Sequence, residues 1–326
     1  MRFGIWLDFR NPPPWRQPWT DIYRDSLSLA TLAEDLGFDS VWVSEHHLTA
    51  DGYLPSVFPT LAAIAARTER IRLGTAVLLA PLHHPLRLAE DAAVVDQLSD
   101  GRLDLGVAPG YRQHEFDTLG IARTERGRRT DEAIEILRLA WRGRPFSYAG
   151  RCFQFNNVTV APPPHQSPHP PIWVGGNSQA AAIRAGRLGC HFLPDGGTPT
   201  DFIALYRVTL ANHGHDPGDF EITTTASVHI CEDPDRGWTQ VKDHYLYAAN
   251  LYREWYERPT LPSADALDRS RYLVGPPPAI IDGLEQIQAA NGVDRVIFFA
   301  RPPGLAVKTA RDSLRLFAEH VIPHFT

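Results

Sequence analysis

The sequence predicts a (β/α)8 barrel, a single domain over residues 1–326 in which eight parallel strands alternate with helices. Strand-like and helix-like segments alternate along the chain, which is typical of a parallel sheet with helical crossovers. The run IRLGTAVLLA (71–80) is almost continuously apolar, as expected of a strand buried on both faces. An open doubly wound sheet would need a GxGxxG turn after its first strand, and this chain has RNPPPW there.

The first half of the chain supplies four strand–helix pairs. Gly37 and Gly101 mark helix ends, because glycine is the usual residue just past a helix. We expect strands at 3–9, 38–43, 71–80 and 102–108. We expect helices at 21–36, 56–67, 86–98 and 124–141.

The second half begins with an insertion after the fourth strand, over about 109–170. Within it, 146–155 alternates with period two and predicts a hairpin, while the proline-rich 161–171 predicts a loop. We place the remaining strands at 171–176, 190–194, 221–230 and 293–300, with helices between the last three. Further helices are expected at 178–187 and around Ala310, Leu314, Phe317 and Val321. Residues from about 230 to 275 form a candidate lid, and 255–272 reads either as its mobile part or as a disordered surface loop.

Composition excludes several classes of protein. A net charge of −6 gives no basic footprint for nucleic acid. Three cysteines without a CxxC pair argue against a disulfide framework and a structural zinc site. The segment MRFGIWLDF (1–9) lacks the charged-then-apolar pattern of a signal region, and we expect it to form the first strand instead. No apolar run approaches the roughly 20 residues of a membrane span. We therefore expect a cytoplasmic protein without membrane or nucleic-acid partners.

Active sites of such barrels form at the carboxyl ends of the strands. These ends place Asp8, the segment Glu45–His47 and the stretch VGGNS (174–178) among the candidates. Glycines there permit close backbone approach, and Asn177 or Ser178 can cap a helix whose N–H groups attract phosphate. The same residues fit an ordinary tight turn and N-cap equally well.

Two histidine pairs, 46–47 and 83–84, also lie near strand ends. Adjacent side chains on an extended chain point to opposite faces, so His46 and His47 should serve different roles. A barrel metallohydrolase would want an HxH pair on one strand, and none ends the first strand. We assign no metal ligand. A histidine that is merely hydrogen-bonded at a strand end is the alternative to a catalytic one.

Several motifs together resemble the bacterial luciferase-like flavin-dependent family. The segments are FGIWLDF (3–9), GFDSVWVSEHHLTADGY (37–53), the stretch from RTERIRLG to APGY (67–111), and PIWVGGNSQAAAIRAGRLG (171–189). The likeness is strong up to about residue 195 and looser around GVDRVIFFARPPG near the end of the chain.

The resemblance implies roles for individual residues. His46 corresponds to the family's acid–base group beside the reactive edge of the flavin, and His47 would anchor the loop. Glu115 matches a carboxylate of the strand-four loop and is the second catalytic candidate, while Ala76-Val77 matches a cis peptide against the flavin ring. The expected cofactor-binding residues are Asp8, Ala76, Val77, Gly110, Tyr111, Gly175, Gly176, Asn177 and Ser178.

The resemblance also implies a reaction. We expect a two-component monooxygenase that uses reduced FMN from a flavin reductase, O2 and a small organic substrate. A hydride-transfer enzyme that uses the deazaflavin F420 and a non-catalytic flavin-binding protein are the alternatives. Ala108, Pro109 and Asn177 stand where the light-emitting subunit has cysteine, arginine and glutamate, so bioluminescence is not expected.

Two groups of apolar residues could belong either to the core or to a functional surface. Family members are often dimers, so we expect a homodimer; the residues that could pack between copies, or face their own barrel, are Ile64, Leu88, Ala92 and Val95. The aromatic residues that could line a substrate chamber, or belong to the core, are Trp6, Trp42, Phe298 and Phe299.

Overall fold

The computed structural model describes residues 1–325. Its main sheet has the strand order β10-β13-β1-β2-β3-β5-β8-β9, with β4 beside β5. The strands pair in parallel and helices separate them along the chain, which is the strand succession of the predicted (β/α)8 barrel. Two compact units divide the chain: unit 1 holds residues 1–42, 49–54 and the chain from 222 onward, and unit 2 holds 43–48 and 55–221.

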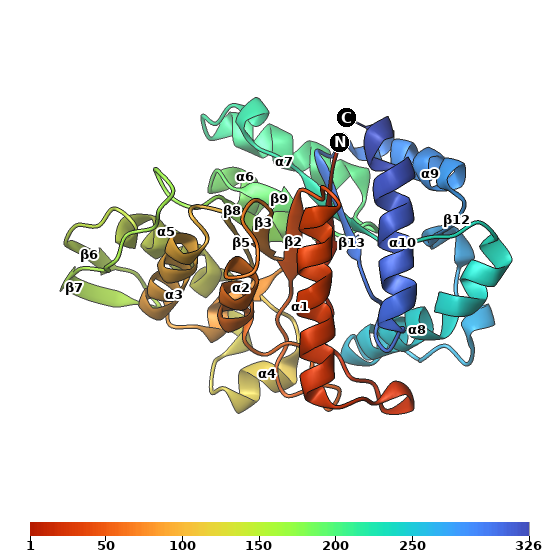
Figure 1. The fold of residues 1–326 in the computed structure, drawn as a ribbon. Helices are drawn as coiled ribbons and strands as arrows, with labels where there is room; N and C mark the ends of the chain where they lie inside the picture. The colour runs from red at the N-terminus through yellow and green to blue at the C-terminus, as the bar shows by residue number, and fades with distance from the viewer. Residues whose placement is uncertain (326) are drawn as a thin grey trace. The chain divides into compact units, whose positions relative to one another are not determined.

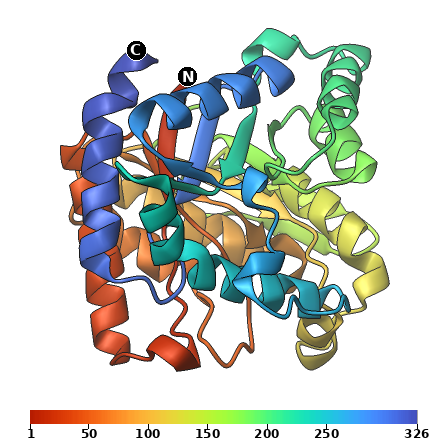
Figure 2. The same ribbon diagram turned by 90° about the vertical axis from the view of Figure 1, so that its right-hand side faces the viewer.

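Unit 1 is built on parallel strands flanked by long helices. The strands are β1 (Arg2–Trp6), β2 (Ser40–Val43), whose last residue belongs to unit 2, β10 (Thr223–Ala226) and β13 (Arg295–Phe299). Helix α1 (Trp19–Asp35) and helix α10 (Val307–His320) run side by side along this sheet (Figures 1 and 2). The apolar stripe expected on the last helix is buried, as predicted, at Ala310, Leu314, Phe317 and Val321.

An aromatic cluster joins the sheet of unit 1 to α10. The Phe317 ring lies 5.0 Å from that of Phe3 and 4.7 Å from that of Phe298, centroid to centroid. Edge-on and tilted pairs of this kind stabilise a core beyond their buried area. Phe298 therefore belongs to the core.

The candidate lid range of unit 1 contains regular structure. Helix α8 (Pro234–Trp255) is capped by Asp233, whose side chain accepts from the N–H groups of Asp235 and Arg236. The later part holds the 3-10 turns η5 (Ala264–Ala266) and η6 (Arg269–Arg271), followed by the strand β12 (Leu273–Gly275). Both readings of 255–272 stay predictions.

The predicted strand 221–230 ends early. It splits into β10 and β11 (Val228–Ile230), and β11 pairs with β12 instead of joining the main sheet. The other elements of unit 1 are η1 (Pro13–Trp15), α9 (Pro277–Asn291) and η7 (Ile322–His324).

Unit 2 carries the remaining strands of the sheet. They are β3 (Arg72–Thr75), β4 (Leu78–Leu79), β5 (Leu103–Ala108), β8 (Ile172–Gly175) and β9 (His191–Leu193). Its helical elements outside the insertion are α2 (Val57–Ala65), η2 (Ala80–Leu82), α3 (Pro85–Leu98), α6 (Gln179–Arg187), α7 (Thr200–Asn212) and η4 (Pro217–Asp219). The continuous strand predicted over 71–80 is interrupted at Ala76-Val77, which separates β3 from β4.

The insertion after β5 is present, and its core is a helix with a hairpin attached. Its elements are α4 (Gln113–Thr118), η3 (Arg123–Glu125), α5 (Arg126–Ala140), and the antiparallel strands β6 (Phe146–Ala149) and β7 (Gln154–Val158). The hairpin lies beside α5 (Figure 1). The carboxylate of Glu132 on α5 accepts from the backbone N–H groups of Arg151, Cys152 and Phe153 at 2.9–3.2 Å. One buried side chain thus holds the hairpin turn against the helix.

Candidate active site

The site is built from the end of β2, where the chain runs Ser44-Glu45-His46-His47. Alternate side chains point to opposite faces here, as the extended backbone requires. His46 joins one hydrogen-bond network, while Glu45 and His47 join another. The divergence of the two histidine side chains that the sequence predicts is therefore present in the geometry.

His46 is buried and held through one ring nitrogen. Its Nδ1 lies 2.9 Å from Oε1 of Glu115. Because an ionised carboxylate can only accept, Nδ1 carries the proton and donates it, so that in the neutral ring Nε2 is an acceptor. Nε2 lies 3.5 Å from the hydroxyl oxygen of Tyr111, a long contact in which Tyr111 is then the donor.

Glu115 sits on α4 with its side chain completely buried. Besides His46, its Oε1 accepts from the backbone N–H of His47 at 2.8 Å and from Nη1 of Arg112 at 2.9 Å. The same Arg112 nitrogen donates to the carbonyl of His47 at 2.7 Å. Glu115 and Arg112 together fix the backbone on which His46 is mounted.

The pKa values of the pair follow from burial and mutual charge. Burial lowers the pKa of His46, and the hydrogen bond and charge of Glu115 oppose that change without reversing it. Burial alone would raise the pKa of Glu115, but the hydrogen bonds from His46 and from the His47 N–H hold it below the usual value. The arrangement is a neutral imidazole oriented by an ionised carboxylate.

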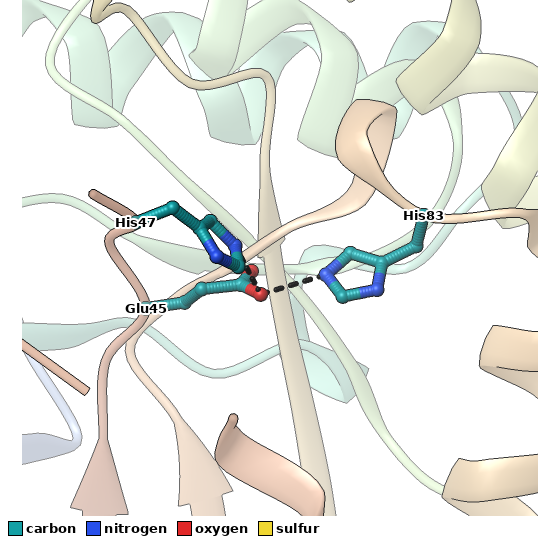
Figure 3. Close-up of side chains that lie close together, drawn as sticks. All are labelled: Glu45, His47 and His83. Atoms are coloured by element: carbon teal, nitrogen blue, oxygen red, sulfur yellow. Dashed lines mark hydrogen bonds and ion pairs between the residues drawn. The ribbon is translucent and has the colours of Figure 1, made fainter. Parts of the chain in front are cut away.

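The second network contains His83, to which the sequence analysis assigned no role. Glu45 Oε1 accepts from Nε2 of His47 at 2.9 Å and from Nε2 of His83 at 2.7 Å (Figure 3). Burial alone would raise the pKa of Glu45, but these two hydrogen bonds lower it to about 2. The sequence signal for His83 was its place shortly after the 71–80 run, but its partner can be identified only once the chain has folded.

The segment Ala76-Val77 is half-exposed within a buried run. Its peptide bond is cis, as the resemblance implied, and residues 73–75 and 78–80 on either side are buried. A Cβ atom at Gly175 would lie 2.5 Å from Cγ1 of Val77, so β8 approaches this segment more closely than a side chain would permit. Val77 and Gly175, two predicted cofactor residues, are thereby in contact.

The other predicted phosphate residues lie at the ends of β5 and β8. Gly110 adopts a positive φ of 72°, and Arg123 donates to the carbonyl of Tyr111 at 3.1 Å. Gly176 is also in the positive region, at 140°, and Ser178 caps α6 by accepting from the N–H of Ala181 at 3.2 Å.

The side chain of Asn177 connects two loops of unit 2. It donates to Asp195 and accepts from Thr198 Oγ1 at 2.9 Å. The structure therefore gives Asn177 a bond between the loops that follow β8 and β9, beside its predicted role at the phosphate.

Asp8 belongs to unit 1 and forms a buried ion pair with Arg10. Its carboxylate accepts from Nε and Nη2 of Arg10 at 2.5–3.0 Å. The guanidinium lies 4.9 Å from the ring centroid of Tyr53, whose hydroxyl contacts that of Tyr252 at 2.9 Å. Nη1 of Arg10 is buried without a hydrogen-bond partner among residues 1–325.

Two of the four aromatic residues proposed for a substrate chamber, and all of the residues proposed for a dimer interface, belong to the core of the single chain. Trp42 is buried, whereas Trp6 and Phe299 are partly exposed and stack at 4.2 Å. The four candidate interface residues, Ile64, Leu88, Ala92 and Val95, are each at most 2% exposed within the single chain, so the reading that they face their own barrel is confirmed. None of the helices in the described part of the chain is long and apolar enough to cross a membrane.

Comparison with protein families places this site in context. The model of a family described as luciferase-like monooxygenase matches residues 1–295. The oxygenase component of the flavin-dependent trigonelline monooxygenase of Acinetobacter baylyi is 34% identical over 193 residues, which is 59% of this chain and 53% of that protein. The F420-dependent glucose-6-phosphate dehydrogenase of Microbacterium testaceum is 35% identical over 178 residues, 52% of each chain. The chain thus spans about half the length of these two curated relatives.

Two further relatives match over most of their length. The 4-hydroxyprotoasukamycin monooxygenase of Streptomyces nodosus subsp. asukaensis is 27% identical, with 100% of this chain and 92% of that protein covered. The crystal structure of the monooxygenase RslO1 from Streptomyces bottropensis superposes with a TM-score of 0.91 at 29% identity, covering 100% of both chains.

Proposed function

We propose that this chain, which belongs to the luciferase-like monooxygenase family, is the oxygenase component of a two-component flavin-dependent monooxygenase. It takes reduced FMN from a separate flavin reductase and uses O2 to oxidise a small organic substrate. The observation that carries the proposal is the His46–Glu115 pair, a buried neutral imidazole whose Nδ1 is fixed by a carboxylate at 2.9 Å. A general acid–base residue must be held within hydrogen-bond reach of the proton that it transfers. The bond at Nδ1 fixes the His46 ring, and Nε2 is the ring atom that can exchange a proton.

The residues of unit 2 fit a flavin. Ala76 and Val77 present a half-exposed surface between buried segments, and Gly175 lets β8 pack directly against Val77. A surface without projecting polar groups suits one face of a planar ring system. At the start of α6, Gly176 and the capping Ser178 suit the phosphate end, because the free N–H groups of a helix start attract anions.

When bound, reduced flavin supplies the electrons and the reaction with O2. The protein residues then have three tasks. His46 Nε2 takes up or delivers a proton at the reacting group, Glu115 keeps the Nδ1 proton in place, and Tyr111 directs its hydroxyl at Nε2. The burial of His46 limits the access of water to this proton. Glu115 is thus a positioning residue, whereas the sequence placed it among the catalytic ones.

The choice of FMN is supported by the relatives that match over the full chain. Both the 4-hydroxyprotoasukamycin monooxygenase and RslO1 carry the name monooxygenase, which supports a reaction with O2. The F420-dependent relative matches half of the chain at similar identity, so F420-dependent hydride transfer is the second candidate.

A binding titration separates these candidates. The purified chain is titrated anaerobically with reduced FMN and, separately, with reduced F420, with tryptophan fluorescence as the readout. We expect saturable binding of reduced FMN, followed on admission of air by reoxidation kinetics that differ from those of free flavin. Saturable binding of F420 alone would overturn the proposal in favour of hydride transfer. Binding of FMN with the reoxidation rate of free flavin would favour a non-catalytic flavin-binding protein.

The homodimer and the cytoplasmic location stay predictions. Helix α3 offers a surface for self-association, because Val94 and Leu98 are 43% and 57% exposed on it. Light scattering coupled to size-exclusion chromatography tests the dimer directly, and a Val94→Lys, Leu98→Lys variant tests this face.

A further inference from the structure

Three side chains in unit 2 converge with the atoms that transition metals prefer. Glu45 and His47 are two residues apart at the end of β2 and therefore share a face, and His83 follows η2 (Figure 3). One carboxylate oxygen and two imidazole nitrogens lie within 4.8 Å of one another. A carboxylate with two histidines is a donor set typical of Zn²⁺ and related divalent ions.

The carboxylate is oriented for coordination through one oxygen. Glu45 Oε2 accepts from the backbone N–H of Leu79 at 2.6 Å, and the backbone N–H of Glu45 itself donates to the Val77 carbonyl at 3.1 Å. These bonds leave Oε1 to face both histidines, which present the same nitrogen to it, Nε2. A ligand fixed by an outer hydrogen bond is the usual arrangement at protein metal sites.

The burial pattern provides an approach for an ion. The Glu45 side chain is fully buried, whereas the side chains of His47 and His83 are 20% and 28% exposed. An ion can therefore enter from the histidine side and keep water in its remaining position.

A metal ion would lengthen the two present hydrogen-bonded distances only slightly. A tetrahedral zinc with ligand bonds of about 2.0–2.1 Å separates neighbouring ligand atoms by about 3.3 Å, so the Oε1–Nε2 distances of 2.9 and 2.7 Å would each increase by about half an ångström. The ion replaces the hydrogens between Nε2 and Oε1, and the displaced protons pass to Nδ1 of the same rings or to water. The bond from Leu79 to Oε2 persists throughout.

We propose that Glu45, His47 and His83 form a binding site for a divalent transition metal of the Zn²⁺ type. The sequence assigned no metal ligand because adjacent histidines diverge. The structure instead combines alternate residues of one strand end with a histidine from 36 positions further on. None of the three proposed ligands is His46 or a predicted flavin residue, so metal binding can be measured separately from the proposed monooxygenase activity.

The test uses the flavin-free chain, with any affinity tag removed and metals stripped by a chelator. Zn²⁺ binding is measured by calorimetry, and Co²⁺ binding by its visible absorption, which reports tetrahedral coordination by nitrogen and oxygen. We expect one equivalent of metal, with affinity reduced at least about 10-fold in His83→Gln and in His47→Gln, since even outer-shell changes cost about 10–100-fold. His84→Gln, in the adjacent residue outside the cluster, is the matched control and should bind normally.

Two results would overturn the proposal. One is the lack of saturable binding of both Zn²⁺ and Co²⁺ by the parent chain, which would make the cluster a purely structural hydrogen-bond network. The other is parent-like affinity in both His83→Gln and His47→Gln, which would place the metal elsewhere. Far-ultraviolet circular dichroism and thermal melting of each variant separate loss of a ligand from loss of the fold, and His83→Gln, in a loop, keeps the test open if His47→Gln misfolds.

Discussion

The carboxyl ends of β1 and β2 both carry buried ionisable groups, but the two ends neutralise them differently. At the end of β1, in unit 1, Asp8 is paired with Arg10, two residues further along the chain. At the end of β2, in unit 2, His46 is paired with Glu115, which is 69 residues distant in sequence. The first pair joins a carboxylate to a guanidinium, and the second joins a carboxylate to an imidazole that can gain or lose a proton.

The difference indicates that one buried pair stabilises the fold, whereas the other orients a group that can transfer a proton. The Asp8–Arg10 pair is encoded locally and accompanied by aromatic rings, so it defines one conformation of the strand end. The His46–Glu115 pair needs the tertiary fold to form, and it fixes one ring nitrogen while the other contacts a tyrosine hydroxyl at 3.5 Å. We expect substitutions at the first pair to affect stability and at the second to affect turnover.

The largest effect is expected for His46→Gln. Removal of the proton-transfer group should lower kcat by about 10²–10⁴-fold, as is usual for a general acid–base residue. Binding of reduced flavin, followed by fluorescence, should persist, and the urea midpoint should change little. His84→Gln is the control. A decrease in kcat of less than about 10-fold would remove His46 from the proposed role.

Asp8→Ala should have the largest effect on folding. It leaves the guanidinium of Arg10 buried without its counter-charge, which costs about 3–5 kcal/mol in the free energy of unfolding. The measurement is equilibrium unfolding in urea. The double variant Asp8→Leu, Arg10→Met removes both charges and should recover much of that loss. If the double variant is as unstable as the single one, the ion pair is not the cause.

Glu115→Gln tests whether the charge of Glu115 is needed to position His46. The amide keeps the size of the side chain but removes its charge, and a charged hydrogen bond contributes about 1.5–3 kcal/mol. We expect kcat to fall about 10- to 100-fold, less than for His46→Gln, with a KM close to that of the parent. An effect confined to KM would argue that Glu115 contacts substrate instead of positioning His46.

A smaller effect is expected at a third strand end, where Ser178 follows β8. Ser178→Ala removes the N-cap of α6 and should destabilise the chain by about 1 kcal/mol, while Ser178→Gly should cost only a few tenths. Urea unfolding gives both values. If reduced FMN binds more weakly to both variants than to the parent chain, and by a similar factor, the hydroxyl contributes to the phosphate site as well as to the helix.

The smallest effect concerns pH. Burial lowers the pKa of His229 on β11, and the hydrogen bond to Gln240 only partly opposes this. In the unfolded chain the pKa of His229 is about 6.5, so the unfolded chain takes up a proton more readily than the folded one. The contribution of neutral His229 to stability is complete above that pH and is lost as pH falls. Replacement by glutamine should flatten the decline in unfolding free energy between about pH 7 and 5, and an unchanged slope would assign it to other histidines.

The sequence predicted the barrel because its periodicities are local. The alternation of strands and helices, the hairpin at 146–155 and the stripe on α10 depend on neighbours a few residues apart. Hydropathy alone did not predict the split of 71–80, since it does not register a backbone break within an apolar run. The resemblance implied the cis peptide bond at which the split occurs. The 22-residue helix α8 was not placed within the candidate lid range, because its proline, glycine and many polar residues resemble those of a loop.

The candidate site was predicted unevenly for the same reason. The divergence of His46 and His47 follows from strand geometry and needed no structure. The bonds from His46 to Glu115 and from Glu45 to His83 join residues 69 and 38 positions apart, and only the folded chain brings them together. Residues that work in pairs across the fold are therefore recognised singly from the sequence and given their roles by the structure.

The hydrogen bonds from the hairpin turn to Glu132 also limit how this region can change in length. In most hairpins the tip is the place where extra residues are accepted at little cost. Here the turn presents three consecutive N–H groups to one carboxylate, so an added residue would break that array and leave a buried charge unsatisfied. Insertions and deletions in homologues should therefore concentrate in the proline-rich segment 161–171 that follows the hairpin. The turn between β6 and β7 should keep its four residues.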